Sequence, residues 1–316
     1  MQAAGNCRPA GESARNHRSG ASGRPLSGEG LVCGRGDAVC RPPGPAAAAV
    51  GDSPAQALAD RGFRHLEQED REAALGCFNR VIELEPDNPE AYNNAGYVHE
   101  MMDHLSSALQ MYRKALALDE KNTEALINIA HIRDLEGDYY GALHHYQAAI
   151  ALEPDNAKAL FCLGVLYDRH DMFDEAARQY RQVLDRDPLH RKAIFNLGNL
   201  CIQTGDYDHA AELFGCLLEQ DPANAEAWNN IGSLYEELGN LASALHAWQQ
   251  CLKLDPLQVK ANLNLARVAY SLWESTGTGS YRLEAVNRLK FVLALDPRCD
   301  QARNLLEQAD PRTPSA

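Results

Sequence analysis

The sequence lacks three features that mark membrane or secreted proteins. No apolar run approaches the roughly 18 residues of a membrane-spanning helix, and no N-x-[ST] glycosylation acceptor is present. The nine cysteines include no C-x-x-C pair and follow no regular framework, which disfavours a disulfide scaffold, a zinc ribbon or a thioredoxin-like redox site. We therefore predict no membrane partner and a reducing, cytoplasmic location.

Catalytic and metal-binding motifs are also missing. There is no G-x-S-x-G motif or Walker loop. No two of the eleven histidines form the i, i+4 pair of a helical zinc site, because His144 and His145 are adjacent and His99 and His104 are five residues apart. Four cysteines occupy helix positions that suit a small apolar residue: Cys162, Cys201, Cys216 and Cys251. We predict no catalytic residue, no metal ligand and no cofactor, so the chain is not expected to be an enzyme.

Positive charge is scarce beyond the N-terminal segment. The formal net charge is -14. Residues 1–54 hold six Arg and four acidic residues, which leaves them at +2 and places -16 on the rest of the chain. Such a field disfavours nucleic acid, whose phosphates attract clustered Lys and Arg, and favours basic proteins or peptides. The alternative is that the acidic residues form only a solvated surface.

Residues 1–54 lack the continuous apolar core of a secretory signal. They are rich in Gly, Ala, Arg and Pro, and the stretch RPPGPAAAAV (41–50) buries too little to offset its ordering entropy. We expect a disordered leader. An organellar transit segment is the alternative, because the segment contains Arg and few acids.

The sequence does contain a repeat. The stretch AWNNIGSLYEELGN (227–240) places Trp228, Gly232 and Tyr235 at intervals that recur at a shift of 34 residues. The repeated units are 55–88, 89–122, 123–156, 157–190, 191–224, 225–258 and a seventh, longer by seven residues, 259–299. The first small residue of each unit is Gly62, Gly96, Ala130, Gly164, Gly198, Gly232 or Ala266, and the second is Ala74, Ala108, Ala142, Ala176, Ala210, Ala244 or Ala285.

Small residues at two fixed places let two helices approach closely, so each unit is expected to be a helical hairpin. The turn pairs a glycine able to adopt a positive φ with a side-chain acceptor for the next helix, as in Gly137-Asp138, Gly205-Asp206 and Gly239-Asn240. Most units end at a proline, which disfavours helix in the residue before it. These prolines are Pro86, Pro154, Pro188, Pro222, Pro256 and Pro297.

Units with W-x2-I-G-x2-Y, then A-x3-W and a closing Pro resemble tetratricopeptide repeats (TPR) over residues 55–299. The resemblance implies an all-α fold, a right-handed α-solenoid of seven helical hairpins whose concave side is lined by the first helix of each hairpin. Arg61, Glu120 and Asn262 depart from the family pattern. Residues 300–310 have apolar side chains at helical spacing and are expected to form a C-terminal capping helix, followed by a disordered tail at 311–316.

A row of asparagines is expected on the concave side. The sixth residues of the units are Asp60, Asn94, Asn128, Cys162, Asn196, Asn230 and Asn264. A carboxamide both donates and accepts, so such a row can hold the backbone of an extended peptide. It resembles the asparagine ladder in the TPR region of O-linked N-acetylglucosamine transferase, where the amides grip a threaded peptide. The alternative is that asparagine here stabilises the hairpin or faces water.

Further residues are expected to face the same groove. An apolar patch comprises Ile127, Phe161, Val165 and Phe195, with Tyr97 and His131 beside it, and the ninth residue of the fifth unit adds Asn199. Acidic residues at the rim include Glu100, Asp134 and Glu236. Rings at the centre of a concave surface would anchor a partner's apolar residue. The alternative is that tight winding buries them between hairpins.

The acidic C-termini of Hsp70 and Hsp90 are not expected partners. Family members that bind them use a carboxylate clamp with Lys at the fifth place of a unit. The fifth residues here include no Lys: Ala59, Asn93, Ile127, Phe161, Phe195, Asn229 and Leu263.

The seventh unit contains SLWESTGTGSYRLE (271–284), whose Ser, Thr and Gly cluster is expected to form a loop that widens the hairpin. Trp273 and Tyr281 flank this segment, where they either pack back on the array or form a second contact surface.

Together these features favour a non-catalytic scaffold or adaptor that binds an extended, basic or neutral segment of a protein partner in its concave groove. One alternative is a substrate-recognition module associated with a separate enzyme, such as a glycosyltransferase. Another is a structural subunit of a large assembly, such as a ciliary transport complex, in which the outer surface makes the contacts.

Overall fold

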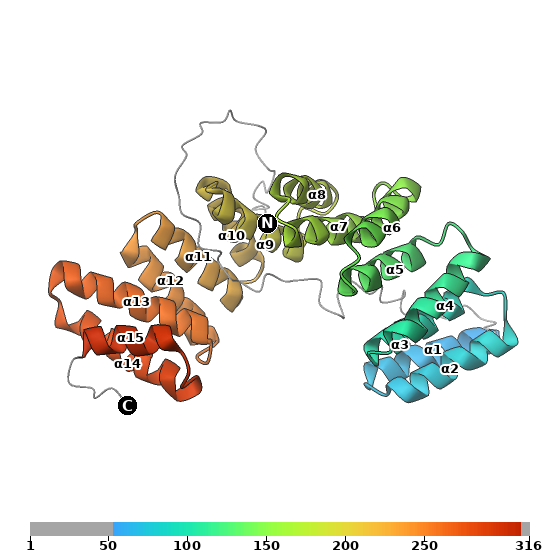
Figure 1. Cartoon of the computed structure of the whole chain (residues 1–316), viewed down its shortest axis with the longest axis horizontal. Coiled ribbons are helices and arrows are strands. Elements are labelled where there is room, and N and C mark those ends of the chain that lie inside the picture. Colours follow the sequence, from blue (N-terminus) through green and yellow to red (C-terminus); the bar gives the residue numbers. More distant parts are fainter. Residues whose placement is uncertain (1–52, 311–316) are drawn as a thin grey trace, which may run out of the picture. The chain divides into compact units, whose positions relative to one another are not determined.

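The structure, a computed structural model, describes residues 53–310, and within this range all regular structure is α-helical (Figure 1). The expectations for a disordered leader and tail concern residues 1–52 and 311–316, which lie outside the described residues. The first helix begins at Pro54, one residue before the expected repeat. Ser53 Oγ accepts a hydrogen bond from the Gln56 amide (3.1 Å), and proline suits the first position of a helix.

The chain divides into two compact units, whose described parts are residues 53–193 and 194–310. The first unit contains α1 (Pro54–Glu67), α2 (Arg71–Leu84), α3 (Pro89–Met101), α4 (Leu105–Leu118), α5 (Thr123–Leu135), α6 (Tyr139–Leu152), α7 (Ala157–Arg169) and α8 (Phe173–Arg186). The boundary falls within α9 (Arg191–Thr204). The second unit continues with α10 (Tyr207–Gln220), α11 (Ala225–Glu237), α12 (Leu241–Leu254), α13 (Val259–Thr276), α14 (Gly279–Leu295) and α15 (Asp300–Ala309).

The two helices of a hairpin meet where a small residue faces an aromatic ring. A Cβ added to Gly232 of α11 would lie 2.5 Å from the Trp248 indole of α12, and one added to Gly96 would lie 2.6 Å from the Tyr112 ring. The same glycine-to-ring contact joins Gly62 to Phe78, Gly164 to Tyr180 and Gly198 to Phe214. Each ring is fully buried, so the repeated glycine makes room for the largest side chain of its hairpin.

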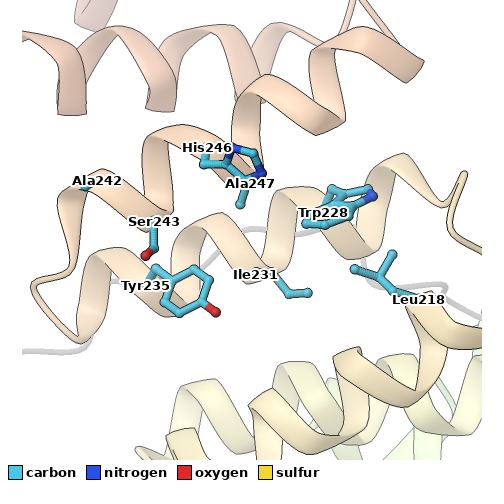
Figure 2. Close-up of a pocket in the computed structure, with 8 residues that line it drawn as sticks. All are labelled: Leu218, Trp228, Ile231, Tyr235, Ala242, Ser243, His246 and Ala247. Carbon is cyan, nitrogen blue, oxygen red and sulfur yellow. The ribbon is translucent and has the colours of Figure 1, made fainter.

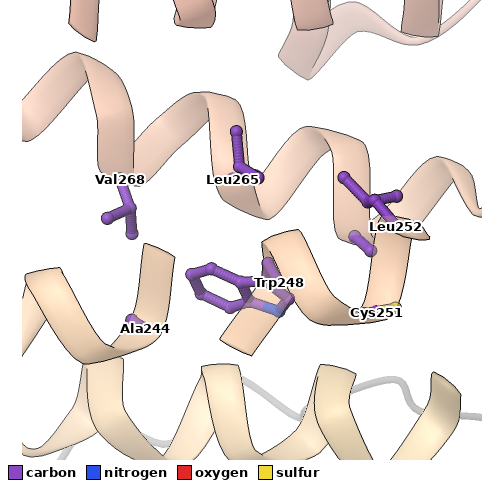
Figure 3. Close-up of a cluster of buried hydrophobic side chains, with 7 residues drawn as sticks. Ala244, Trp248, Cys251, Leu252, Leu265 and Val268 are labelled. Atoms are coloured by element: carbon purple, nitrogen blue, oxygen red, sulfur yellow. The ribbon is translucent and has the colours of Figure 1, made fainter. Parts of the chain in front are cut away.

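Consecutive hairpins then cover one another. Trp248, Cys251 and Leu252 of α12 pack against Leu265 and Val268 of α13, the first helix of the next hairpin (Figure 3). A hairpin that leaves an apolar face needs a neighbour to cover it. After the seventh hairpin α15 supplies this cover, as Ala302, Leu306 and Ala309 join the cluster of α13 and α14.

The turn inside each hairpin needs one residue with a positive φ. Gly137 and Gly239 fill this place with φ of 77° and 71°. In three other hairpins an acidic residue takes the same conformation: Glu69, Asp103 and Asp171. The acceptor that follows caps the second helix, because Asp138 Oδ1 accepts from the Gly141 amide at 2.9 Å.

The expected loop in the seventh hairpin is wrong. The inserted residues lengthen both helices, so that α13 ends at Thr276 and α14 begins at Gly279. Gly277 adopts a φ of 70° and ends α13. Trp273 packs against Tyr270, with ring centroids 5.5 Å apart, and the Arg282 guanidinium lies over the Trp273 ring at 5.2 Å. This packing extends regular structure through a sequence that favours a turn.

Asn262 occupies a place that usually holds a large apolar residue, and it is fully buried. Its Nδ2 donates to the carbonyls of Pro256 (3.1 Å) and Gln258 (3.0 Å), and its Oδ1 accepts from Arg288 Nη1 at 3.1 Å. A buried amide whose donors and acceptor are used costs little stability, so this departure from the repeat pattern does not break the array.

We expect Gly232→Ala to lower the free energy of unfolding by about 1–3 kcal/mol, the usual cost of overpacking a core. The added methyl group would meet the Trp248 ring at 2.5 Å. Gly215→Ala is the matched control in the same unit, since nothing lies within 4 Å of its Cβ position. That change should raise stability by roughly 0.5–1 kcal/mol. Urea unfolding followed by far-UV circular dichroism measures both, and equal shifts would contradict the proposed close contact.

Candidate functional site

In the first unit, the first helices of the hairpins contact one another along one side. We call the surface formed there by α3, α5 and α7 the inner face; it includes Asn93, Glu100, Glu124, Asn128 and His131. Direct hydrogen bonds join α3 to α5 on this side, and α5 also contacts α7. The expected groove residues between 89 and 169 therefore belong to one continuous surface.

The asparagines of the inner face bind each other. Asn128 Nδ2 donates to Asn93 Oδ1 at 3.2 Å, and Asn93 Nδ2 donates in turn to Glu124 Oε2 at 3.3 Å. Asn128 has no exposed surface, and Asn94 is buried beside a small hollow of about 60 Å³ between α1, α2 and α3. The amide of Asn128 thus fixes the register of neighbouring hairpins, which is the alternative considered for this row.

Glu100 lies inside the unit, which corrects its expected place at an exposed rim. Its Oε1 accepts from His131 Nδ1 at 2.8 Å and its Oε2 accepts from the Tyr112 hydroxyl at 2.9 Å. Glu100 and His131 are each 1% exposed. A carboxylate that leaves water needs such donors, so the pairing with His131 and Tyr112 explains the burial.

His131 has one nitrogen to spare. Because the Glu100 carboxylate only accepts hydrogen bonds, Nδ1 carries the proton, and Nε2 of the neutral ring is then an acceptor. Nε2 is buried and finds no hydrogen-bond partner within the described part of the chain. An acceptor in this state is stabilised by any donor that reaches it.

Several carboxylates of the inner face are only partly compensated. Burial raises the pKa of Glu124, Lys158 opposes this shift, and the carboxylates of Glu90 and Glu153 add to it. Burial also raises the pKa of Asp168, which accepts from the Tyr180 hydroxyl. Glu90 and Glu153 are exposed. A cation placed among Glu90, Glu124 and Glu153 would therefore relieve a mutual repulsion.

Asp134, another expected rim residue, forms an ion pair with Arg169 of the next hairpin. Its side chain is mostly buried. The pair leaves little net charge at this place, so Asp134 serves contact between α5 and α7 within the first unit.

The expected apolar patch is closed where the first unit contains it. Ile127, Phe161, Val165 and Tyr97 are all buried. The Phe161 ring packs against Tyr180 and His190, with ring centroids 5.8 Å and 5.3 Å apart. The expectation of exposed rings is therefore wrong for these four residues, and burial among the hairpins describes them.

The remaining expected residues lie in the second unit and also join neighbouring hairpins. Asn230 Nδ2 donates to Asn199 Oδ1 at 2.6 Å. Arg267 donates to Glu236 Oε2 at 2.7 Å and to Asn264 Oδ1 at 3.4 Å. Burial raises the pKa of Glu236, and Arg267 opposes this shift. Phe195 and Asn196 are buried, and the Phe195 ring packs against Phe214 at 6.1 Å.

An open hollow of about 460 Å³ in the second unit was missed by the sequence reasoning. Figure 2 shows its lining from α10, α11 and α12: Leu218, Trp228, Ile231, Tyr235, Ala242, Ser243, His246 and Ala247. Trp228 is partly exposed, whereas Leu126 and Leu160 at the same repeat position are buried. The indole Nε1 donates to the Pro222 carbonyl at 3.1 Å, which holds the ring at the edge of the hollow. A tryptophan less buried than its counterparts was the available signal.

Residues 53–310 contain no cluster of three or more His, Cys, Asp or Glu side chains placed to hold a metal ion. The buried thiol of Cys251 is unreactive, since burial raises its pKa to about 12. None of the helices between Pro54 and Ala309 combines the length and apolar character needed to cross a membrane.

The described residues thus form an α-solenoid of stacked helical hairpins, a class that presents extended surfaces to other proteins. Profiles of the tetratricopeptide repeat match residues 89–122, 165–222 and 225–256, and a TPR repeat profile matches 62–103 and 135–170. The chain belongs to the tetratricopeptide repeat family, whose fold is generally a non-catalytic scaffold for protein interaction.

Solved structures share this fold. A tetratricopeptide repeat protein from Parabacteroides merdae ATCC 43184 is 20% identical, with 81% of this chain and 98% of that chain covered and a TM-score of 0.56. YrrB, described as a TPR protein with an unusual peptide-binding site, is 23% identical, with 58% and 95% covered and a TM-score of 0.50. PilF of Pseudomonas aeruginosa is 19% identical, with 66% and 94% covered and a TM-score of 0.59. A search of curated proteins found no match.

Proposed function

We propose that this protein is a non-catalytic adaptor whose inner face, in residues 53–193, binds an extended segment of a protein partner that carries basic side chains. The observation that carries the proposal is the surplus of hydrogen-bond acceptors and negative charge on this face. Glu90, Glu124 and Glu153 lie close enough to raise the pKa of Glu124 in addition to the effect of burial. His131 Nε2 adds a buried acceptor that no donor of the described residues meets.

A basic segment supplies what this surface lacks. Arginine brings five N–H donors in a planar group that remains charged, and each pairs well with carboxylate oxygen. An extended segment also suits the repeat, because first helices about 10 Å apart match about three residues of extended chain. YrrB, which shares the fold, is described as a peptide-binding TPR protein.

The proposal gives the asparagines a supporting part. Asn93 and Asn128 hold α3 and α5 in register and orient the Glu124 carboxylate through the hydrogen bond from Asn93 Nδ2. The partner's charge is then recognised by carboxylates, and its backbone is aligned by a surface whose spacing the asparagines fix.

The test uses the chain from residue 53 onward and three labelled peptides of equal length, in which alternate residues are Arg, Gln or Glu. Fluorescence anisotropy should show the tightest binding for the Arg peptide and a weakening as salt rises from ~0.05 to ~0.5 M. The inner-face triple variant, Glu90→Gln with Glu124→Gln and Glu153→Gln, should bind the Arg peptide about tenfold more weakly, which corresponds to roughly 1.4 kcal/mol.

A matched variant removes the same charge elsewhere in the unit. Glu72→Gln, Asp174→Asn and Asp185→Asn change three exposed acids on the second helices α2 and α8. Binding by this variant should stay within about twofold, since exposed charges more than a Debye length away are screened. Equal losses in both triple variants, or equal binding of the Glu peptide, would contradict recognition at the inner face.

The hollow around Trp228 favours the second candidate, a structural subunit of a larger assembly. Its lining comes mainly from α11 and α12 in residues 194–310, away from the residues that define the inner face. In that case partner binding would persist in the inner-face triple variant, so the same pair of variants separates the two functions when an assembly partner is assayed.

A further inference from the structure

We propose that the first ligand of the inner face is this chain's own N-terminal segment, residues 1–52, which competes with the external partner. The inference rests on the proposed function, because it assigns an occupant to the same face. It begins from charge. Residues 1–52 hold six Arg and four acidic residues and no Lys, whereas the residues after them carry a formal charge of -16.

The arginines are spaced to meet successive hairpins. Arg15 and Arg18 are three residues apart, and Arg24 follows Arg18 by six. In an extended chain three residues span about 10 Å, the distance between neighbouring packed helices. Arg15 and Arg18 therefore match carboxylates on adjacent first helices, such as Glu90 of α3 and Glu124 of α5.

His131 provides an observation independent of net charge. Its Nε2 is a buried acceptor directed away from Glu100, and the described residues offer it no donor. A guanidinium or a backbone N–H of a segment laid along α3 and α5 supplies the missing donor. Glycine and proline in the N-terminal segment favour an extended chain that lacks internal hydrogen bonds, so its own N–H groups remain available.

Covalent attachment makes such binding effective. The segment joins the array at Ser53, immediately before α1, and the roughly 30 residues between Arg24 and α1 span about 30 Å as a random chain. A tether of this length holds a ligand at an effective concentration on the order of millimolar. A weak contact would then occupy much of the inner face, and an external segment would have to displace it.

The experiment compares the full chain with a chain that begins at residue 53. The shorter chain retains every helix and core contact described above, and circular dichroism checks that it is folded. A labelled synthetic peptide of residues 1–52 should bind the shorter chain, and should bind the full chain at least about tenfold more weakly because the tethered copy competes. The same peptide with all six Arg changed to Gln should lose at least about tenfold in affinity, as should the wild-type peptide on His131→Phe.

The full chain gives a second readout. With the six Arg changed to Gln in place, it should bind the Arg probe peptide as tightly as the chain that begins at residue 53. If the 1–52 peptide does not bind while the Arg probe does, the inference is overturned and the proposed function stands. If neither binds the shorter chain, both are overturned. Equal binding of the 1–52 peptide by full and shorter chains also overturns the competition.

Discussion

Replacing Glu100 by Leu is expected to lower the free energy of unfolding by about 3–5 kcal/mol, the cost of removing one partner of a buried ion pair. Leucine fills a similar volume, so the loss comes from the groups left behind. His131 Nδ1 and the Tyr112 hydroxyl each donate to the Glu100 carboxylate, and both are shielded from water. Without Glu100 these donors remain unsatisfied inside the unit.

A mutant cycle separates this cause from simple loss of packing. Adding His131→Leu and Tyr112→Phe to Glu100→Leu removes both orphaned donors, and most of the lost stability should return because an apolar cluster of similar volume replaces the polar one. If the triple variant is less stable than Glu100→Leu, the polar cluster is not the source of the loss.

The tryptophans provide an internal control for this measurement. Trp228, Trp248 and Trp273 all lie in the second unit, whereas Glu100 lies in the first. Urea unfolding of Glu100→Leu should shift the far-UV circular dichroism transition more than the tryptophan fluorescence transition. Equal shifts in both signals would show that the loss is not confined to the unit that contains Glu100.

The fold was predictable from the sequence because one contact is repeated. A small residue in the first helix and a ring sixteen residues later, as in Gly232 and Trp248, describe a close helix crossing wherever they recur. The spacing of 34 residues then requires stacked hairpins. These are local constraints with a fixed period, and the family profiles match most of the same range.

Helix ends in the seventh hairpin were not predictable in the same way. The cluster of Ser, Thr and Gly between 275 and 280 favours a turn by local preference. Packing among Tyr270, Trp273 and Arg282 extends α13 and α14 instead. Tertiary contact outweighs local preference here, and nothing in the residue types alone reveals that contact.

Candidate site residues were easier to name than to pair. Glu100 meets His131, Asn199 meets Asn230 and Glu236 meets Arg267, each at a separation of 31 residues. This offset is one repeat less about one helical turn, so a residue of one first helix meets the residue three places earlier on the next. Searching for complementary side chains 31 residues apart would have found these pairs.

That register also moves the site. Three acidic residues expected at the rim are used inside the array: Glu100, Asp134 and Glu236. The charge that remains for a partner in the first unit comes from Glu90, Glu124 and Glu153. Net charge fixes the sign of the preferred ligand, but only the pairing of individual carboxylates shows where that ligand binds.

Trp248→Ala is expected to lower stability by about 3–5 kcal/mol, the range for truncating a large buried aromatic residue. The indole has no exposed surface, covers Gly232 and donates from Nε1 to the Asn229 carbonyl at 3.1 Å. Trp248→Phe is the matched control, because Phe214 fills the same repeat position in the preceding hairpin. It should cost clearly less, since the smaller ring still covers the glycine.

The same variant separates the two surfaces of the protein. Trp248 packs beside Ala247, which lines the hollow around Trp228, so its loss should disturb that hollow. The inner face belongs to the other unit, and its first helices α3 and α5 make no listed core cluster with α12. Trp248→Ala, in the chain that begins at residue 53, should therefore bind the Arg peptide within about twofold of the unchanged chain. Urea unfolding and fluorescence anisotropy on the same samples measure both effects, and a joint loss of stability and peptide binding would place the recognition surface in residues 194–310 instead.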